Sequence, residues 1–389
     1  MSWILVRGGH LFAPEDRGIQ DLLMIDGRIV AIGANLPELH ELYPLEIVDA
    51  QDQIVLPGLI DPHLHIIGAS GLGGPTTRTT DLQISCIAGV GITTVISPLG
   101  ADSLSRTLPD LLARAMQMEA EGITAYCYTG GWRIPVPSLM GDPLSDVTYL
   151  DRVLGIKVAI AEPKAPYLSV EELSLLAHAA IIGGKLSGKK AVLHAHVGDR
   201  AEGLHPLEEA VARTGLPIHQ FVATHVNRNP NLWEQAIEYA KSGGSIDITT
   251  MQKPEAGYPK AIHASRTILD ALEKGVPISR ITMSSDGGAG YPRLGPNGEG
   301  MGFYMAGPES ILETVRELVQ AGLSWGQAVS FVTSNTADLF GLVKKGRVEV
   351  GSDADILILK KSGDVDRVYC RAKLMVKDRK PVVQGLFED

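Results

Sequence analysis

The sequence is poor in aromatic residues, in cysteine and in positive charge. Aromatic residues make up 5% of the 389 positions, whereas hydrophobic residues make up 44%, so the core must be largely aliphatic. That apolar content excludes an intrinsically disordered chain. The three cysteines form no CxxC pair, which argues against a disulfide framework or a zinc–thiolate site. A reducing compartment fits this usage, and we expect a cytoplasmic protein.

Long apolar runs and a basic surplus are also missing. No apolar run approaches the roughly 18 residues of a membrane span, and the first residues show no basic region followed by an apolar stretch. We therefore expect no signal peptide and no membrane partner. The net charge of −10 argues against a nucleic-acid partner. It leaves room for a local basic pocket that binds an anionic substrate.

Both ends of the chain have the pattern of short strands with tight turns. Apolar and polar residues alternate around Asp26-Gly27, a dipeptide typical of a two-residue β-hairpin. The last 45 or so residues show the same alternation. We expect residues 1–55 and 346–389 to form one small β-sandwich domain. Two separate β lobes are the alternative.

The middle of the chain, residues 56–345, alternates short aliphatic runs with amphipathic stretches. The runs are nearly continuous in apolar residues, as in strands that are buried on both faces. Eight β then α units predict an α/β fold, a (β/α)8 TIM barrel. The expected strands are 54–65, 92–100, 124–130, 155–161, 191–198, 218–226, 245–250 and 281–286.

Polar residues end or interrupt five of these runs. Since strand ends form the active face of such a barrel, and residues i and i+2 share a strand face, these side chains can reach one another. A single histidine at a strand end is more often a packing residue. Several imidazoles and a carboxylate at the same end favour a divalent metal such as zinc. The residues are His63, His65, Lys157, His194, His196, His225 and Asp286.

Lys157 is unusual because it lies inside an apolar strand. Burial disfavours the charged ammonium, so we expect its pKa to fall. The ordinary alternative is a lysine that extends to the barrel rim. A neutral amine could instead react with CO2 and form a carbamate that bridges two metals.

This pattern resembles the amidohydrolase superfamily. Several segments further resemble its isoaspartyl (β-aspartyl) dipeptidase branch, namely HLFAPEDRGI, GGPTTRT, THVNRN, SIDITT, SSDG and KLMVKD. The resemblance implies a binuclear centre in which hydroxide shared by two divalent ions attacks an amide. His63 and His65 would hold the first ion, His196 and His225 the second, and carboxylated Lys157 both. Asp286 would bind the first ion and act as general base and acid. His194 would be a packing residue or a partner of a ligand.

The substrate positions match the family less well. Arg228 matches a family arginine that binds a substrate carboxylate, and its guanidinium can pair bidentately. Leu72 stands where the family has a glutamate that grips a free amino group, although a shifted loop could bring Glu299 into that role. The other departures are Trp132 for a tyrosine, Ala101 for a threonine, Lys164 for an arginine and Gly290 for a serine; Ser70 opens the loop that contains Leu72.

The sequence thus predicts a metal-dependent hydrolase of a small carboxylate-bearing amide or dipeptide. The replaced glutamate keeps two alternatives open, a cyclic amidase of the hydantoinase or dihydroorotase kind and an N-acyl amino acid hydrolase. A non-catalytic scaffold is a further alternative, but it should have lost ligands. By the resemblance we expect a homo-oligomer. The glycine-rich segment 287–308 is expected to be a long loop at the active face, either a mobile lid or an ordinary exposed loop.

Overall fold

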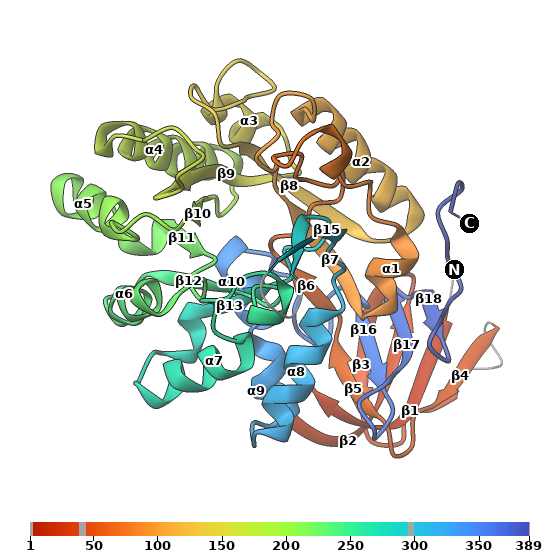
Figure 1. Cartoon of the computed structure of the whole chain (residues 1–389). Coiled ribbons are helices and arrows are strands. Elements are labelled where there is room, and N and C mark those ends of the chain that lie inside the picture. The colour runs from red at the N-terminus through yellow and green to blue at the C-terminus, as the bar shows by residue number, and fades with distance from the viewer. Residues whose placement is uncertain (1–2, 39–43, 295–298, 389) are drawn as a thin grey trace.

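The computed structural model describes residues 3–38, 44–294 and 299–388. Eight parallel strands form one sheet that curls around a common axis, in the order β13-β12-β11-β10-β9-β8-β7-β6 (Figure 1). Each overlaps one of the expected runs, so the predicted barrel is confirmed. The strands are β6 (Leu59–Asp61), β7 (Ile92–Ser97), β8 (Thr124–Gly130), β9 (Val153–Ile160), β10 (Val192–Val197), β11 (Phe221–Thr224), β12 (Ser245–Thr249) and β13 (Ile281–Ser284).

Helices cover the outside of the barrel. α4 shows how local sequence sets their ends: the Ser169 hydroxyl accepts from the Glu172 amide at 3.2 Å, and the Glu172 carboxylate accepts from the Ser169 amide at 2.8 Å. None of the helices in the described ranges is both long enough and apolar enough to cross a membrane. The helices are α1 (Ile84–Gly89), α2 (Leu108–Glu121), α3 (Pro143–Tyr149), α4 (Val170–Ser187), α5 (His205–Thr214), α6 (Pro230–Lys241), α7 (Ala264–Glu273), α8 (Ser310–Gln320), α9 (Trp325–Ser330) and α10 (Ser334–Phe340).

The barrel closes between β6 and β13 without a strand ladder between these two fully described strands. The buried Asp61 carboxylate accepts hydrogen bonds from the Ser285 hydroxyl and amide. Beyond it, the Asp286 amide donates to the His63 carbonyl at 3.0 Å, and the His65 amide donates to the Gly287 carbonyl at 2.8 Å. This β6–β13 junction (residues 61–65 and 285–287) sets the segment after the first barrel strand beside the segment after the last.

The two chain ends share one nine-stranded sheet, because β5 near the N-terminus pairs antiparallel with β16 near the C-terminus. The predicted β domain built from both ends is therefore confirmed. Asp26 and Gly27 have φ of 47° and 83°, as the predicted tight hairpin requires at both central positions. The strands are β1 (Trp3–Phe12), β2 (Asp16–Ile25), β3 (Arg28–Gly33), β4 (Leu45–Asp49), β5 (Ile54–Pro57), β16 (Ile356–Leu359), β17 (Val365–Cys370), β18 (Lys373–Lys377) and β19 (Lys380–Pro381).

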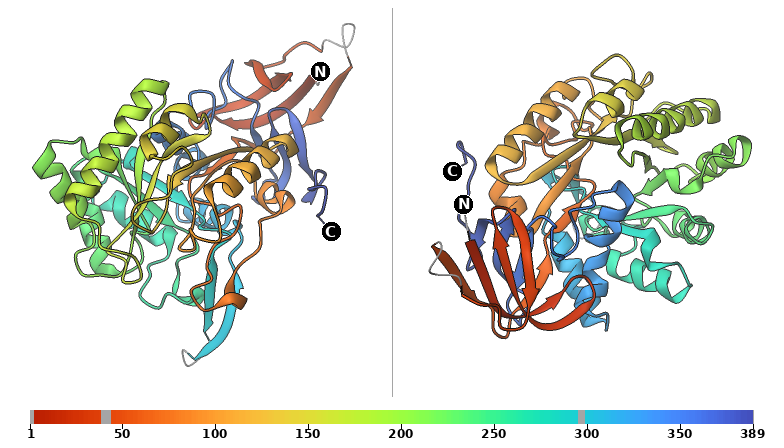
Figure 2. Two further views of the ribbon diagram at one scale, coloured as in Figure 1. Left: turned by 90° about the horizontal axis from the view of Figure 1, so that it is seen from above. Right: turned by 180° about the vertical axis from the view of Figure 1, so that it is seen from behind.

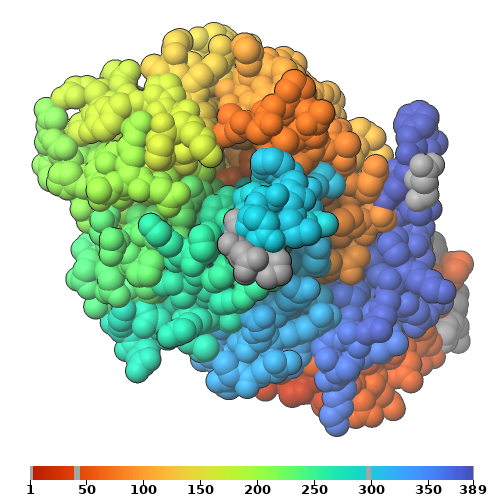
Figure 3. Space-filling model, in the orientation of Figure 1, coloured from red at the N-terminus to blue at the C-terminus, as the bar shows by residue number. Residues whose placement is uncertain are grey.

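The glycine-rich segment 287–308 is not a plain loop. It contains an antiparallel hairpin of β14 (Gly290–Leu294) and β15 (Gly300–Met305), with Tyr291 opposite Tyr304; residues 295–298 lie outside the described part. Cross-strand aromatic pairing supports such a hairpin in spite of its glycines. Figure 2 shows it projecting from the barrel on the side away from β1–β3, and Figure 3 shows it, in cyan, over the middle of one face.

Lys345 ties the barrel to the small sheet domain. Its buried ammonium lies 2.7 Å from Asp355 Oδ2, 2.9 Å from Asp353 Oδ2 and 2.8 Å from the Thr124 hydroxyl of β8. Replacing Lys345 by methionine leaves two carboxylates near one another in a buried site. We expect the free energy of unfolding to fall by about 3–5 kcal/mol, measured by urea denaturation.

The matched control for this prediction is Lys344→Met, since Lys344 is exposed. It should change the free energy of unfolding by no more than about 0.5 kcal/mol. Equal losses in the two variants would show that the buried charge cluster is not what holds the two parts together.

Candidate active site

A cavity of about 1490 Å³ opens at the carboxyl ends of the barrel strands, beside the β14–β15 hairpin. The residues expected to bind metal or substrate all line it, whereas His194, expected to be a packing residue or a partner of a ligand, does not. Those expected to bind metal are His63, His65, Lys157, His196, His225 and Asp286, and those expected to contact substrate are Ser70, Leu72, Ala101, Trp132, Lys164, Arg228 and Gly290. Strand ends that are far apart in sequence therefore converge at one place.

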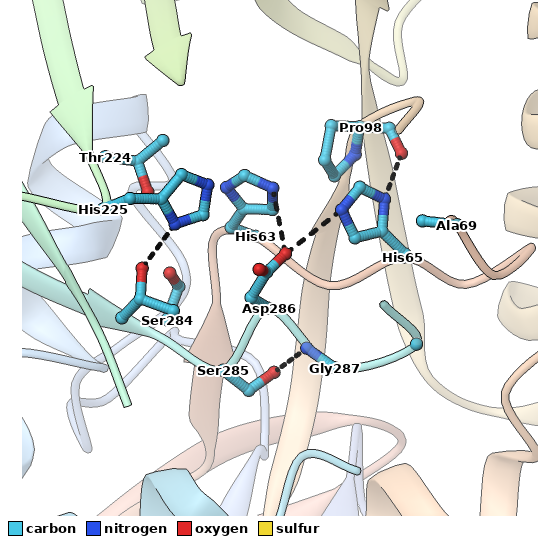
Figure 4. A network of polar contacts seen from close by, with 12 residues as sticks. His63, His65, Ala69, Pro98, Thr224, His225, Ser284, Ser285, Asp286 and Gly287 are labelled. Atoms are coloured by element: carbon cyan, nitrogen blue, oxygen red, sulfur yellow. Dashed lines mark hydrogen bonds and ion pairs between the residues drawn. The ribbon is translucent and has the colours of Figure 1, made fainter. Parts of the chain in front are cut away.

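The centre of this cavity is formed by His63, Lys157 and Asp286. The Lys157 amine lies 3.4 Å from His63 Nε2, and His63 Nε2 lies 3.5 Å from Asp286 Oδ1. His65 Nε2 approaches the same oxygen at 3.2 Å, while its Nδ1 faces the Pro98 carbonyl at 3.1 Å. Figure 4 shows both histidines turned toward Asp286 across the β6–β13 junction. The junction thus brings the HxH pair and the last-strand carboxylate together.

His63, His225 and Asp286 each offer one ligand atom, and these atoms lie within 4.8 Å of one another. His196 lies beside them, with its ring centroid 4.6 Å from that of His225. Its Nε2, however, faces Glu162 Oε2 at 3.1 Å. Burial lowers the pKa of His196 to about 3, so the neutral ring donates this hydrogen bond and keeps the Nδ1 lone pair free. A histidine held by a carboxylate in this way is a common arrangement for a metal ligand.

Backbone strain coincides with two of these residues. His225 and Asp286 are not glycines, yet their φ angles are 70° and 57°. Each such conformation costs on the order of 1–3 kcal/mol and persists only where the surrounding structure enforces it. His225 follows β11 directly and Asp286 follows β13 by two positions, and both side chains line the cavity.

Burial also sets the charge of the site. It lowers the pKa of Lys157 to about 7, so that much of the amine is neutral near neutral pH. Burial, with the Lys157 charge, holds the pKa of His63 and His194 well below the usual range. Burial alone would raise the pKa of Asp286, but hydrogen bonds from His65 and Tyr291 outweigh it and hold the pKa below its usual value. The site therefore offers neutral imidazoles and an ionised carboxylate.

This donor set fits divalent metal ions. Neutral imidazole nitrogens and a carboxylate oxygen are typical zinc ligands. The hydrogen-bond contacts of the Lys157 amine among the described residues are with the two ring nitrogens of His63, which cannot neutralise it, while Asp286 and Asp247 act on it as nearby charges. The same amine as a carbamate would supply the anionic oxygen atoms that such ions require.

Arg228 lies on the cavity wall in the loop after β11. Its side chain is 7% exposed, and its NH1 lies 3.4 Å from Glu162 Oε2 and 3.6 Å from Asp199 Oδ2. Its buried Nε has no hydrogen-bond partner among the described residues. Because the guanidinium lines the cavity, it can donate hydrogen bonds to a ligand carboxylate.

Part of the cavity lining is apolar. Leu72 is 57% exposed, and the neighbouring Gly73 lies against the Phe303 ring of β15, which is 50% exposed. Trp132 lies deeper, with its ring centroid 4.4 Å from that of His196. Glu299 is exposed and is not among the residues that line the cavity. The hairpin therefore closes this side with hydrocarbon.

Comparisons with known proteins identify the family of this chain. The model of the amidohydrolase family matches residues 155–375. The chain belongs to the amidohydrolase family. A solved β-aspartyl dipeptidase of Fervidobacterium islandicum AW-1, in complex with β-Asp-Leu, is 32% identical with a TM-score of 0.88, over 97% of this chain and 98% of that one.

Two more distant similarities extend over nearly the whole chain. A D-hydantoinase of Geobacillus stearothermophilus is 24% identical over 96% of this chain and 93% of its own length. The solved dihydropyrimidinase of Brevibacillus agri is 20% identical, with a TM-score of 0.72 over 98% of this chain and 97% of that one. This amidohydrolase is accordingly a hydrolytic enzyme that acts on C–N bonds, and its resemblance to β-aspartyl dipeptidases is confirmed.

Three residues of the site were not anticipated from the sequence. Glu162 contacts both His196 and Arg228. Burial alone would raise the pKa of Glu162, but the hydrogen bonds from His196 and the Lys164 amide, with the charge of Arg228, outweigh it and lower the pKa to about 2. Glu162 follows β9 by two positions, so the rule that identified the other strand-end residues would have found it. Tyr291 and Phe303 gave no such signal, because only the hairpin brings them to the site.

His194 has the position expected of a supporting residue. It is fully buried, does not line the cavity, and its ring stacks on Tyr128 with centroids 4.7 Å apart. Its Nε2 lies 3.1 Å from His63 Nδ1. That contact leaves His63 Nε2 turned toward Lys157 and Asp286.

Proposed function

We propose that this amidohydrolase cleaves the β-aspartyl amide bond of dipeptide-like substrates at a binuclear divalent metal centre. The supporting observation is the convergence of His63, Lys157, His225 and Asp286 at the barrel end, in a cavity that the Arg228 side chain also lines. A metal-binding set beside a carboxylate-binding guanidinium suits an acidic amide substrate.

The proposed ligands divide into two groups with one shared member. His63, His65 and Asp286 would hold one ion, His196 and His225 the other, and carboxylated Lys157 both. Zinc is the proposed ion, because the set is rich in imidazole. When bound, such ions supply water activated at neutral pH and polarise a carbonyl.

The protein's own groups account for binding and proton transfer. The Arg228 guanidinium pairs with a substrate carboxylate, and Lys164, which lines the same cavity, adds a second positive charge. Asp286, ionised because its pKa lies below the usual value, accepts a proton as the nucleophile forms and returns it to the leaving nitrogen. Its position in the cavity lining beside His63 and His65 suits both transfers.

A second candidate substrate class is supported by the apolar wall. Among the acids that line the cavity within the described residues, Asp286 faces the histidines, Glu162 bonds His196 and Arg228, and Asp199 faces Arg228. Leu72 and Phe303 offer only hydrocarbon. A substrate with a free ammonium group would therefore lose binding free energy on burial there. An N-acylated or cyclic amide that keeps a carboxylate would lose less.

Hydrolysis assays on the zinc-loaded enzyme test the proposal. We expect cleavage of β-Asp-Leu and none of α-Asp-Leu, with N-acetyl-β-Asp-Leu and a hydantoin as the competing substrates. A higher kcat/KM for the acetylated or cyclic compound would assign the enzyme to the second class. Failure to hydrolyse any of these amides would refute both candidates.

Leu72 is expected to limit recognition of a free amino group. In Leu72→Glu, a carboxylate facing the substrate ammonium would form a charge-assisted hydrogen bond of about 1.5–3 kcal/mol. The ratio of kcat/KM for β-Asp-Leu to that for its N-acetyl form should therefore rise by about tenfold or more. Leu72→Gln has the same shape without the charge and should leave the ratio nearly unchanged. An equal rise in both variants would contradict a charge effect.

A further inference from the structure

Tyr291 lies directly behind Asp286. It is the second residue of β14, is 1% exposed, and its hydroxyl donates a hydrogen bond of 2.6 Å to Asp286 Oδ2. It does not line the cavity, so it cannot touch a substrate there. Any influence of Tyr291 on the reaction must pass through the carboxylate that it holds.

The two oxygens of Asp286 have different surroundings. Oδ1 faces His65 at 3.2 Å and His63 at 3.5 Å, whereas Oδ2 is bonded to the Tyr291 hydroxyl. Rotation about the last bond of an aspartate side chain has only broad, shallow preferences. The phenol therefore supplies the contact that fixes which oxygen points to the histidines.

Tyr291 is itself held on several sides. Its ring meets that of Tyr258 edge-on at 5.3 Å between centroids and lies 6.0 Å from that of Tyr304, its partner across the hairpin. Tyr258 in turn carries the Arg228 guanidinium over its ring at 5.7 Å. One packed column of side chains thus joins the carboxylate-binding arginine to Asp286.

We propose that Tyr291 is a positioning residue for Asp286: its hydroxyl holds the carboxylate plane so that Oδ1 faces the HxH pair. This inference rests on the proposed role of Asp286 as the proton acceptor. The β14–β15 hairpin then has a second role besides lining the cavity, because it carries the hydroxyl that orients Asp286.

The test uses Tyr291→Phe in the zinc-loaded enzyme, which removes only the hydroxyl. We expect kcat for β-Asp-Leu to fall by about tenfold or more, the usual size of a hydrogen bond to a charged group. KM and zinc content should stay within about twofold, since no substrate contact is lost. The matched control is Tyr304→Phe on the same hairpin, because Tyr304 does not bond Asp286; its kcat should equal that of the parent.

A double-mutant cycle with Asp286→Asn separates positioning from simple packing. In the Asp286→Asn background, Tyr291→Phe should lower kcat no further, since the two residues then act as one unit. Additive losses, or an unchanged kcat in Tyr291→Phe alone, would refute the positioning role while Asp286 keeps its own. If Asp286→Asn itself retains full kcat, the proposed function fails first and the role of Tyr291 with it.

Discussion

Asparagine in place of Asp286 should reduce kcat by about 10²–10⁴, the range usually contributed by general acid–base catalysis. The amide keeps the shape of the carboxylate but cannot accept the proton and pass it to the leaving nitrogen. KM should change little, because Arg228 and Lys164 are untouched. Steady-state kinetics with measured zinc content would establish this result.

Asp199→Asn is the matched control for that variant. Asp199 lines the same cavity but faces Arg228 at 3.6 Å rather than the histidines. Its removal should affect KM more than kcat. A kcat of Asp286→Asn close to that of the parent enzyme, at equal zinc content, would exclude Asp286 as the proton carrier.

The second large effect is expected for Lys157→Met. Methionine fills nearly the same space without an amine, so no carbamate can form and the shared ligand is lost. Metal ions contribute several kcal/mol of transition-state stabilisation, so activity should fall by about 10³-fold or more. Metal analysis should show fewer ions per chain than in the parent.

Although Lys157→Met should lose activity, we expect it to keep or gain thermostability. Burial lowers the pKa of Lys157 because the charged amine is poorly solvated there. Removing that penalty should leave the metal-free variant at least as thermostable as the metal-free parent, as measured by Tm. Lys157→Glu restores a carboxylate and should keep more metal than Lys157→Met. An inactive variant that is also unfolded would point to a purely structural lysine.

Continuous apolar runs were sufficient to predict the barrel strands. Such runs indicate strands that are buried on both faces, because a strand in that position tolerates almost no polar side chain. The polar residues that break the pattern, such as His63 and Lys157, were informative for the same reason. They carry a burial cost that packing alone does not explain, and the structure places them together.

Contacts between distant segments could not be predicted in the same way. The hydrogen bonds of Asp61 at the β6–β13 junction depend on how the barrel closes, and those of Tyr291 depend on a hairpin rich in glycine. Glu162 is different, since it stands at a strand end and the signal was present. Neighbourhood along a strand is encoded locally, whereas the partners of a side chain across the barrel follow only from the assembled fold.

The β6–β13 junction has a consequence for the stability of the whole enzyme. His63 and His65 follow one edge strand and Asp286 follows the other, and no ladder joins these strands within the described residues. Any divalent ion that these side chains share would act as a clasp across the open side of the barrel. The free energy of ion binding then adds to that of folding. Metal occupancy of the site and closure of the barrel would therefore be thermodynamically linked. Removal of the ions by a chelator would destabilise the barrel first at the β6–β13 junction.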